Sequence, residues 1–285
     1  MPLNRTALKR HPLPPVVDGD KETKGRILIV AGSRQVPGAA LLAAMSAMRA
    51  GAGKLRIATA ESVAPDLAIA MPEALVVSLA EHRDGGLSRS AAKELAEEAQ
   101  HVTAVVAGPG MEQSSVCGAV ADALLASPAK VVLDAALLHS LSPLAVGERA
   151  PENRPILLPH SGELASLLEC DEEAVDADPI GCGIRAAQLY QANVLSKGVI
   201  SHVVTPDGDC WTYKGGAPGL GVSGSGDTLA GIVGGLLSRG ADPLAALLWG
   251  VWLHGEAGAS LARKVGPIGF LAREIPDEIP ALLLR

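Results

Sequence analysis

The sequence predicts a three-layer α/β fold, in which a mostly parallel central sheet carries helices on both faces. Short runs of β-branched residues alternate with Ala- and Leu-rich runs of helical length from residue 26 onward. Parallel strands need crossover connections, and helices usually supply them. No stretch has the composition of a linker, and no repeat of fixed period interrupts the alternation. We therefore expect one domain over residues 25–285, preceded by an arm over residues 1–24.

The expected elements follow this alternation along the chain. The arm is expected to be extended, because Pro12, Pro14 and Pro15 disfavour a helix there. Pro206 and Gly208 predict a hairpin turn, and therefore an antiparallel edge to the sheet. Strands are expected at residues 26–30, 54–59, 75–78, 102–107, 130–133, 155–158, 194–196, 199–205 and 209–213. Helices are expected at residues 38–49, 62–70, 89–100, 116–125, 163–168 and 179–192, with three more after residue 213, the first at 229–237.

Composition and charge exclude several classes of protein. Hydrophobic residues make up 48% of the chain and charged residues 19%, a balance that predicts a large core rather than disorder. One Phe, two Tyr and three Trp leave almost no material for stacking on nucleic-acid bases. The net charge of −7 repels polyanions as a whole, although a local phosphate pocket stays possible. A small nucleotide is therefore a more reasonable ligand than a nucleic acid.

The cysteines and the N-terminus indicate a cytoplasmic protein. The four cysteines form no CxxC pair, so neither a zinc site nor a disulfide framework is predicted, and no other metal-ligand cluster is visible. No apolar segment of the signal-peptide kind follows the basic residues of the arm. The richest apolar stretch, residues 245–253, is much shorter than the roughly 20 residues that span a bilayer. No membrane partner is therefore expected.

A glycine-rich loop before a helix is the first candidate site. Residues 223–228 read SGSGDT and lead into the helix expected at residues 229–237. Backbone N–H groups at such a helix start can bind an anion such as a phosphate. Asp227 is unusual beside an anion, because a carboxylate there costs Coulomb energy unless it takes a proton or holds a metal. The alternative is that Asp227 only caps its helix.

Further turns follow other expected strands. Gly108, Pro109 and Gly110 form one of these turns, and His160 and Lys197 lie in two others. Carboxyl ends of parallel strands share one edge of a sheet, where α/β proteins bind ligands, so a single nucleotide-sized crevice is predicted. Ala39, at the start of the first long helix, is small enough for a flat ligand to lie against it. Each feature also has an ordinary explanation: a plain turn, a hydrogen-bonded surface histidine, a solvated lysine or tight helix packing.

Together these motifs resemble the ADP/ATP-dependent NAD(P)H-hydrate dehydratase family of the ribokinase-like superfamily. The resemblance covers residues 20–282 and rests on several segments taken jointly. These segments are KGR at 24–26 with 27–33, GAALLAAMSAMRAGAG at 38–53, GPG at 108–110, DAALLHSL at 134–141, PHSGE at 159–163, KG at 197–198, GSGD at 224–227, HG at 254–255 and AG at 257–258. It implies a ribokinase-like fold and an enzyme without the epimerase domain that many family members carry in front. It also implies a homo-oligomer, with a tetramer favoured.

The resemblance implies a metabolite-repair lyase that removes water from the 6-hydroxy hydrate of NADH or NADPH, at the expense of ADP or ATP. We expect the nucleotide to require Mg²⁺, because a carboxylate beside phosphates needs charge compensation and the chain is acidic overall. It makes Asp227 the catalytic carboxylate. It places Ala39, Gly110, His160 and Asp227 at the hydrate substrate, and the nucleotide at Lys197, Gly198, Val199, Ile200, Ser201, Gly224, Ser225 and Gly226. Phosphorylation would turn the hydroxyl, a poor leaving group, into a good one, and a base would assist its attack on phosphorus.

Some positions depart from the family pattern. Ala136 and His139 replace an Asp and an Asn in the DAALLHSL segment, Ala217 replaces an Asn ahead of GSGD, and Glu112 replaces a Gly. Two alternatives therefore stay open: a ribokinase-like kinase of a vitamin precursor or sugar, and a catalytically silent nucleotide-binding module. A kinase would leave a stable phosphorylated product, whereas the dehydratase releases phosphate. An intact Asp227 argues against the silent module.

Overall fold

The computed structural model describes residues 1–15, 24–83, 85–143 and 150–284. Within these residues one sheet of nine strands has the order β3-β2-β1-β4-β5-β6-β7-β8-β9. The strands are β1 Arg26–Val30, β2 Lys54–Ala60, β3 Ala74–Leu79, β4 Ala104–Ala107, β5 Lys130–Leu133, β6 Ile156–Leu157, β7 Asn193–Ser196, β8 Ser201–Val204 and β9 Cys210–Tyr213. Strands β1 to β7 pair in parallel, whereas β8 and β9 pair antiparallel, which confirms the predicted hairpin edge.

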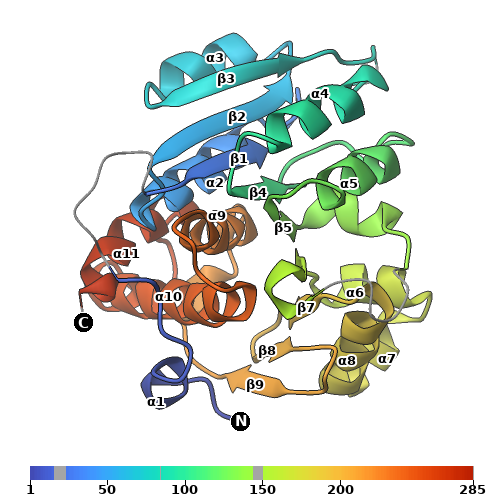
Figure 1. Ribbon diagram of the computed structural model, residues 1–285. Helices are drawn as coiled ribbons and strands as arrows, with labels where there is room; N and C mark the ends of the chain where they lie inside the picture. The colour runs from blue at the N-terminus through green and yellow to red at the C-terminus, as the bar shows by residue number, and fades with distance from the viewer. Residues whose placement is uncertain (16–23, 84, 144–149, 285) are drawn as a thin grey trace.

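Helices cover both faces of the sheet, as the alternation predicts. One group packs together on the left of the sheet in Figure 1: α2 Gly38–Arg49, α9 Ser225–Ser238, α10 Pro243–Lys264 and α11 Ile275–Leu283. The other group lies on the right: α4 Ser90–Ala99, α5 Cys117–Leu125, α6 Ser161–Leu168, α7 Glu172–Ala177 and α8 Pro179–Tyr190. Helix α3, Ala64–Ala70, packs on β3 at the top edge. The fold is therefore a three-layer α/β/α arrangement.

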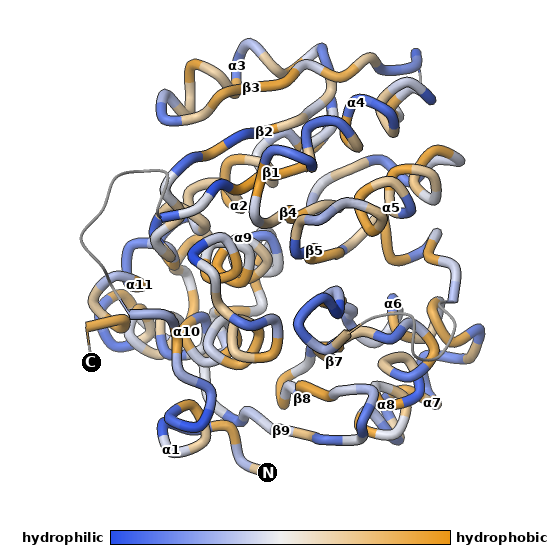
Figure 2. Tube along the Cα trace, in the orientation of Figure 1, coloured by the Kyte–Doolittle hydropathy of each residue, from blue (hydrophilic) through white to orange (hydrophobic). Residues whose placement is uncertain are grey.

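The middle strands form the core. Ile27, Leu28, Ile29 and Val30 of β1 are all buried, and Figure 2 shows the hydrophobic colour along β1. A parallel strand covered on both faces is hydrophobic along its whole length rather than at alternate positions. The run of four residues in β4, AVVA, is buried throughout for the same reason.

Close packing of α2 against α9 brings the first turns of these helices together. A Cβ atom at Gly231 of α9 would lie 2.2 Å from the backbone oxygen of Ala43 in α2, a distance that only glycine permits. In the same way a Cβ atom at Gly235 would lie 2.5 Å from the backbone oxygen of Ala47, and Ala39, Ala40 and Ala44 of α2 are also buried. The small residues of α2 thus serve helix packing, and they also place Ala39 near the start of α9.

The N-terminal arm differs from the expectation of an extended segment. Residues Arg5–Leu8 form one helical turn, α1, because the Asn4 side chain accepts hydrogen bonds from the backbone N–H groups of Thr6 and Ala7. The prolines follow this turn and do not interrupt it. Ahead of the turn the chain is extended and bonds to β9, where the Leu3 N–H donates to the Thr212 oxygen at 2.8 Å. Part of the arm, residues 16–23, lies outside the described residues.

Smaller differences concern element ends. β4 begins at Ala104 and β8 at Ser201, each two residues later than expected, and the short helix α7 was not predicted. Element ends are the least reliable part of a sequence-based assignment. Across the described ranges, no helix combines the length and the apolar character needed to cross a bilayer.

Candidate active site

Five parallel strands end at one edge of the sheet, and the predicted turns meet there. β1, β4, β5, β6 and β7 are neighbours in that order and run in the same direction. Gly110 follows β4, His160 follows β6 and Lys197 follows β7. An isolated parallel bridge joins His160 to Lys197, whose N–H donates to the Pro159 oxygen at 2.9 Å. The structure therefore brings these turns side by side, as the shared-edge argument requires.

A buried ion pair lies at this edge. The Lys197 ammonium is 2.8 Å from Asp134 Oδ1 and 3.7 Å from Glu163 Oε2. Burial alone would lower the pKa of Lys197, but the charges of Asp134 and Glu163 outweigh this and raise it. Burial raises the pKa of Asp134, and the Lys197 charge opposes that change. Lys197 is thus held as a cation by carboxylates and is not the solvated lysine of the ordinary explanation.

The start of α9 lies directly against this ion pair. A Cβ atom at Gly226 would be 3.8 Å from Lys197 Nζ and 4.0 Å from Asp134 Oδ2. The helix begins at Ser225, four residues earlier than expected, with Gly224 at the N-cap in a left-handed conformation, φ 87°. No side chain caps α9, so the alternative that Asp227 caps its helix is wrong. In this turn the Ser225 N–H donates to the Val222 oxygen at 3.1 Å, and the N–H groups of Gly226 and Asp227 are the ones that can meet an anion.

Asp227 is the third residue of α9 and is poised to titrate near neutral pH. Burial and the charge of Asp134 raise its pKa to about 6, while the charge of Lys197 opposes this rise. A base works best when its pKa lies close to the operating pH, because it is then ionised and still accepts protons well. The environment of Asp227 is therefore that of a general base.

Partly buried His254 of α10 supports the first turn of α9. Its Nε2 atom lies 3.1 Å from both the Oγ atom and the backbone oxygen of Ser225. Burial lowers the pKa of His254 to about 4, so the ring is neutral at pH 7. A backbone oxygen only accepts hydrogen bonds, so Nε2 carries the ring proton. His254 therefore fixes the position of Ser225 and adds no charge to the site.

His160 has a structural contact of its own. Its Nδ1 atom accepts hydrogen bonds from the N–H groups of Gly162 and Glu163, at 3.1 and 3.3 Å, which caps α6. The Glu163 carboxylate accepts from the His160 N–H at 2.9 Å and completes a capping box. The imidazole side chain is 59% exposed. His160 is therefore a hydrogen-bonded surface histidine, which was the non-functional alternative in the sequence analysis. Its contact with a substrate stays a prediction.

The structure also brings Ala39 and Gly110 together. A Cβ atom at Gly110, whose φ is 63°, would lie 2.5 Å from Ala39 Cβ. On the far side of Lys197 the turn between β7 and β8 projects outward, with Val199 99% and Ile200 43% exposed. Gly198 and Ser201 are joined within this turn, because Ser201 Oγ donates to the Gly198 oxygen at 3.2 Å. The predicted site residues thus line one edge, and the turn at Val199 extends it.

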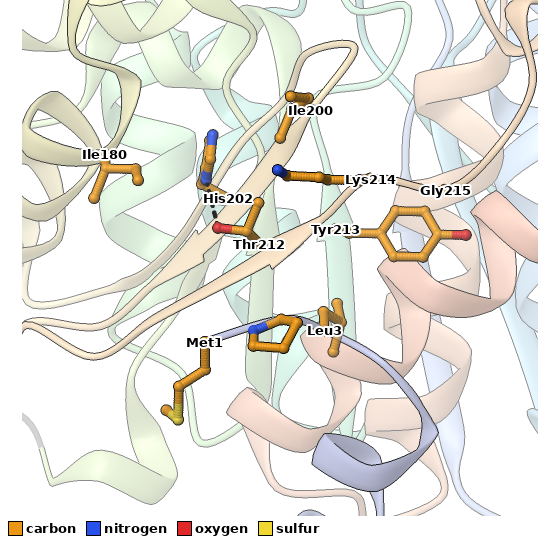
Figure 3. A pocket seen from close by; sticks show the side chains of 10 residues that line it. Met1, Leu3, Ile180, Ile200, His202, Thr212, Tyr213, Lys214 and Gly215 are labelled. Carbon is orange, nitrogen blue, oxygen red and sulfur yellow. Dashed lines mark hydrogen bonds between the residues drawn. The ribbon is translucent and has the colours of Figure 1, made fainter.

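A pocket of about 770 Å³ lies beside this edge rather than at its centre (Figure 3). It is formed by the chain start, α8 and the β8–β9 hairpin, with His202 hydrogen-bonded to Thr212 at 3.0 Å. Of the predicted nucleotide residues, Ile200 lines this pocket, whereas Asp134, Lys197 and Asp227 do not. The pocket is therefore separate from the carboxylate cluster, by which we mean Asp134, Glu163 and Asp227 around Lys197.

The sequence analysis assigned no role to three residues that the structure places at the site: Asp134, Glu163 and His254. The signal for Asp134 is a lone acidic residue directly after the buried strand β5. Glu163 stands three residues after His160, the spacing of a capping box. Of the departures from the family pattern, Ala136 is buried in the core and His139 Nδ1 lies 3.0 Å from Ser166 Oγ, so neither leaves a buried polar group without a partner.

Three comparisons with known proteins agree with this geometry. A family described as NAD(P)H-hydrate dehydratase matches residues 27–281. An ADP-dependent (S)-NAD(P)H-hydrate dehydratase from Xanthomonas campestris is 48% identical, over 98% of this chain and 94% of its own length. The ADP/ATP-dependent NAD(P)H-hydrate dehydratase of Bacillus subtilis, crystallised with ATP and Mg²⁺, superposes with a TM-score of 0.84 at 30% identity, covering 100% of this chain and 98% of that one.

A ribokinase-like protein from Enterococcus faecalis has the same fold, with a TM-score of 0.82 at 22% identity over 99% of this chain and 94% of that one. The fold and the site therefore define a ribokinase-like α/β protein in which a helix start without a side-chain cap lies beside the buried carboxylate of Asp134. Within that class, the chain belongs to the NAD(P)H-hydrate dehydratase family.

Proposed function

We propose that this protein removes water from the 6-hydroxy hydrate of NADH or NADPH, at the expense of ADP or ATP, and so restores the reduced cofactor. The observation that carries the proposal is the position of Asp227, a carboxylate with a pKa of about 6 in the uncapped first turn of α9. The 48% identity to an ADP-dependent dehydratase supports the same reaction and disfavours the kinase alternative. A cytoplasmic location is part of this proposal.

The residues of the site suit transfer of a phosphoryl group to the hydrate. Asp227 takes the proton of the C6 hydroxyl while the hydroxyl oxygen attacks the terminal phosphorus, and the nucleotide leaves shortened by one phosphate. The N–H groups of the α9 start and the Lys197 ammonium stabilise the charge on the transferring group. Loss of the new phosphate ester from C6, with a proton from the neighbouring carbon, then reforms the ring double bond.

The substrate side of the site is formed by Ala39, Gly110 and His160. Ala39 and Gly110 present a surface without side-chain bulk, where a flat ring can lie. His160 carries a ring proton on Nε2, because Nδ1 accepts two backbone hydrogen bonds. That Nε2–H group lies 3.5 Å from Glu163 Oε1, and because the side chain is 59% exposed it can also meet a polar group of the substrate.

We expect the reaction to require Mg²⁺ bound to the nucleotide phosphates and to water. Among the described residues no group of three or more His, Cys, Asp or Glu side chains is arranged to hold a metal ion. A carboxylate beside phosphates needs charge compensation, and Mg²⁺ commonly binds through substrate phosphates with few protein ligands. Addition of excess chelator should abolish turnover, and readdition of Mg²⁺ should restore it. Undiminished turnover in chelator contradicts this expectation.

The function is tested by incubating the purified protein with hydrated NADH or NADPH and with ADP or ATP in turn. Return of absorbance at the reduced-nicotinamide band, together with stoichiometric release of phosphate, is the expected result. A stable phosphorylated product without restored absorbance indicates the kinase alternative instead. Nucleotide binding without any turnover indicates the silent module.

We also expect a homo-oligomer, with a tetramer favoured. The family resemblance implies one, and several large apolar side chains are exposed, among them Ile69 at 82% and Ile268 at 71%. Light scattering should give a mass that is a multiple of the 29.0 kDa chain. A species of single-chain mass at working concentrations contradicts the expectation.

A further inference from the structure

One buried carboxylate, Asp134, has no part in the reaction described above. It is 2% exposed and follows β5 at the centre of the site edge. A buried carboxylate is costly unless a partner compensates its charge. Its partner is Lys197, at 2.8 Å and 63 positions further along the chain.

The backbone around Asp134 is held tightly. Its N–H donates to the Ala107 oxygen at 3.0 Å, and its own oxygen lies so close to Gly108 that a Cβ atom there would be only 1.7 Å away. The next residue, Ala135, adopts φ 48°, a left-handed conformation that non-glycine residues adopt at a cost of about 1 kcal/mol or more. Strain of this kind persists where surrounding contacts require it, and it is common at functional sites.

The cluster around Asp227 carries more negative than positive charge. Asp134 approaches from the end of β5, Glu163 from α6 and Lys197 from the end of β7, while neutral His254 faces the same turn from α10. Three carboxylates therefore share one ammonium group. A nucleotide brings further negative charge to these three carboxylates. The site can accept it only if the Lys197 ammonium stays in place and a proton or a further cation compensates the remaining negative charge.

We propose that Asp134 is a positioning residue: it holds the Lys197 ammonium against the first turn of α9, and the two charges together decide when Asp227 is ionised. The geometry supports this, because the Cβ position of Gly226 is within 4.0 Å of both Lys197 Nζ and Asp134 Oδ2. Glu163 is committed to its capping box, so Asp134 is the carboxylate that anchors Lys197 at hydrogen-bond distance. The inference rests on the proposed function for the role of Asp227, but its test does not require turnover.

The first experiment follows the ionisation of Asp227 directly. Protein labelled with carbon-13 at the aspartate carboxyl groups is titrated by NMR, and the Asp227 signal is assigned by its loss in Asp227→Asn. Asp134→Asn, which removes a negative charge, should lower the midpoint by about one pH unit, and Lys197→Met should raise it by a similar amount. The matched control is Asp207→Asn, which removes an exposed carboxylate that pairs with Arg154, away from the site. It should leave the midpoint unchanged.

Shifts in the same direction for the two site variants, or no shift, overturn the proposal. Lys197→Met leaves a buried carboxylate unpaired and can fail to fold, which its melting temperature reports. The double variant Asp134→Asn with Lys197→Met removes both charges together, and its midpoint should lie between those of the single variants. A double variant that matches either single variant also overturns the proposal.

The second experiment tests whether Asp134 acts through Lys197. Calorimetric affinity for ADP with Mg²⁺ is measured for Asp134→Ala, Lys197→Met and their combination. Each single variant should weaken binding about tenfold or more, and the double variant should be no weaker than Lys197→Met alone. Additive losses overturn the positioning role. Normal nucleotide binding and titration shifts in a protein that restores no reduced nicotinamide would instead refute the proposed function and leave this inference intact.

Discussion

Asp227→Asn should lower the rate of hydrate dehydration by about 100-fold or more, because the variant keeps the shape of the side chain but removes the proton acceptor. Affinity for ADP or ATP should hold or improve, since a negative charge near the phosphates is lost. For the wild type, turnover should fall as the pH drops through about 6, where Asp227 becomes protonated. Steady-state rates between pH 5 and 8, with calorimetry for the nucleotide, measure both effects.

The same variant should be more stable than the wild type at neutral pH. The pKa of Asp227 rises from 3.8 to about 6 on folding, so the folded state binds this proton more tightly than the unfolded state does. The wild type therefore loses stability as the pH rises from about 4 to 6, and the asparagine avoids that loss. The gain above pH 6 is less than about 3 kcal/mol, because the side chain is partly exposed. Native turnover, or a lower melting temperature at pH 7, contradicts the assignment of Asp227 as a strained base.

Gly108→Ala should be among the most destabilising single substitutions in the site. Gly108 has φ 120°, and an added Cβ atom would meet the backbone oxygen of Asp134 at 1.7 Å. That oxygen cannot retreat freely, since the Asp134 N–H is bonded to the Ala107 oxygen. Backbone strain of about 1 to 2 kcal/mol and overpacking of about 1 to 3 kcal/mol predict a loss of about 2 to 5 kcal/mol in the free energy of unfolding. Nucleotide affinity should fall as well, because Asp134 and therefore Lys197 are displaced.

Gly208→Ala is the control for backbone strain alone. Gly208 also has a positive φ, 88°, but nothing lies within 4 Å of its Cβ position. Gly208→Ala should therefore lower the free energy of unfolding by only about 1 to 2 kcal/mol, from backbone strain, and should keep normal nucleotide affinity. Chemical denaturation of both variants gives the comparison. Equal losses of stability would mean that Asp134 moves aside at little cost.

The sheet and its two covering layers could be predicted from the sequence alone. A short run of Ile, Leu and Val between glycines predicts a buried strand such as β1. Pro206 and Gly208 likewise determine the hairpin, because turn geometry depends on a few adjacent residues. The position of Asp227 directly after a glycine-rich loop could be predicted for the same reason. Each of these features depends on residues close together in the chain.

Only the tertiary structure decided which charged residues meet. Asp134 and Lys197 follow strands that are separated in the sheet by β6, and no local pattern specifies that order. The one-turn helix of the arm is a local feature that was missed, because the prolines, which lie beyond it, do not set the conformation of the whole arm and the Asn4 cap was overlooked. The start of α9 and its contact with His254, 29 positions away, also depend on packing between helices. Spacing along the chain reveals local geometry, whereas the ionisation of Asp227 depends on burial and on charges that arrive from distant segments.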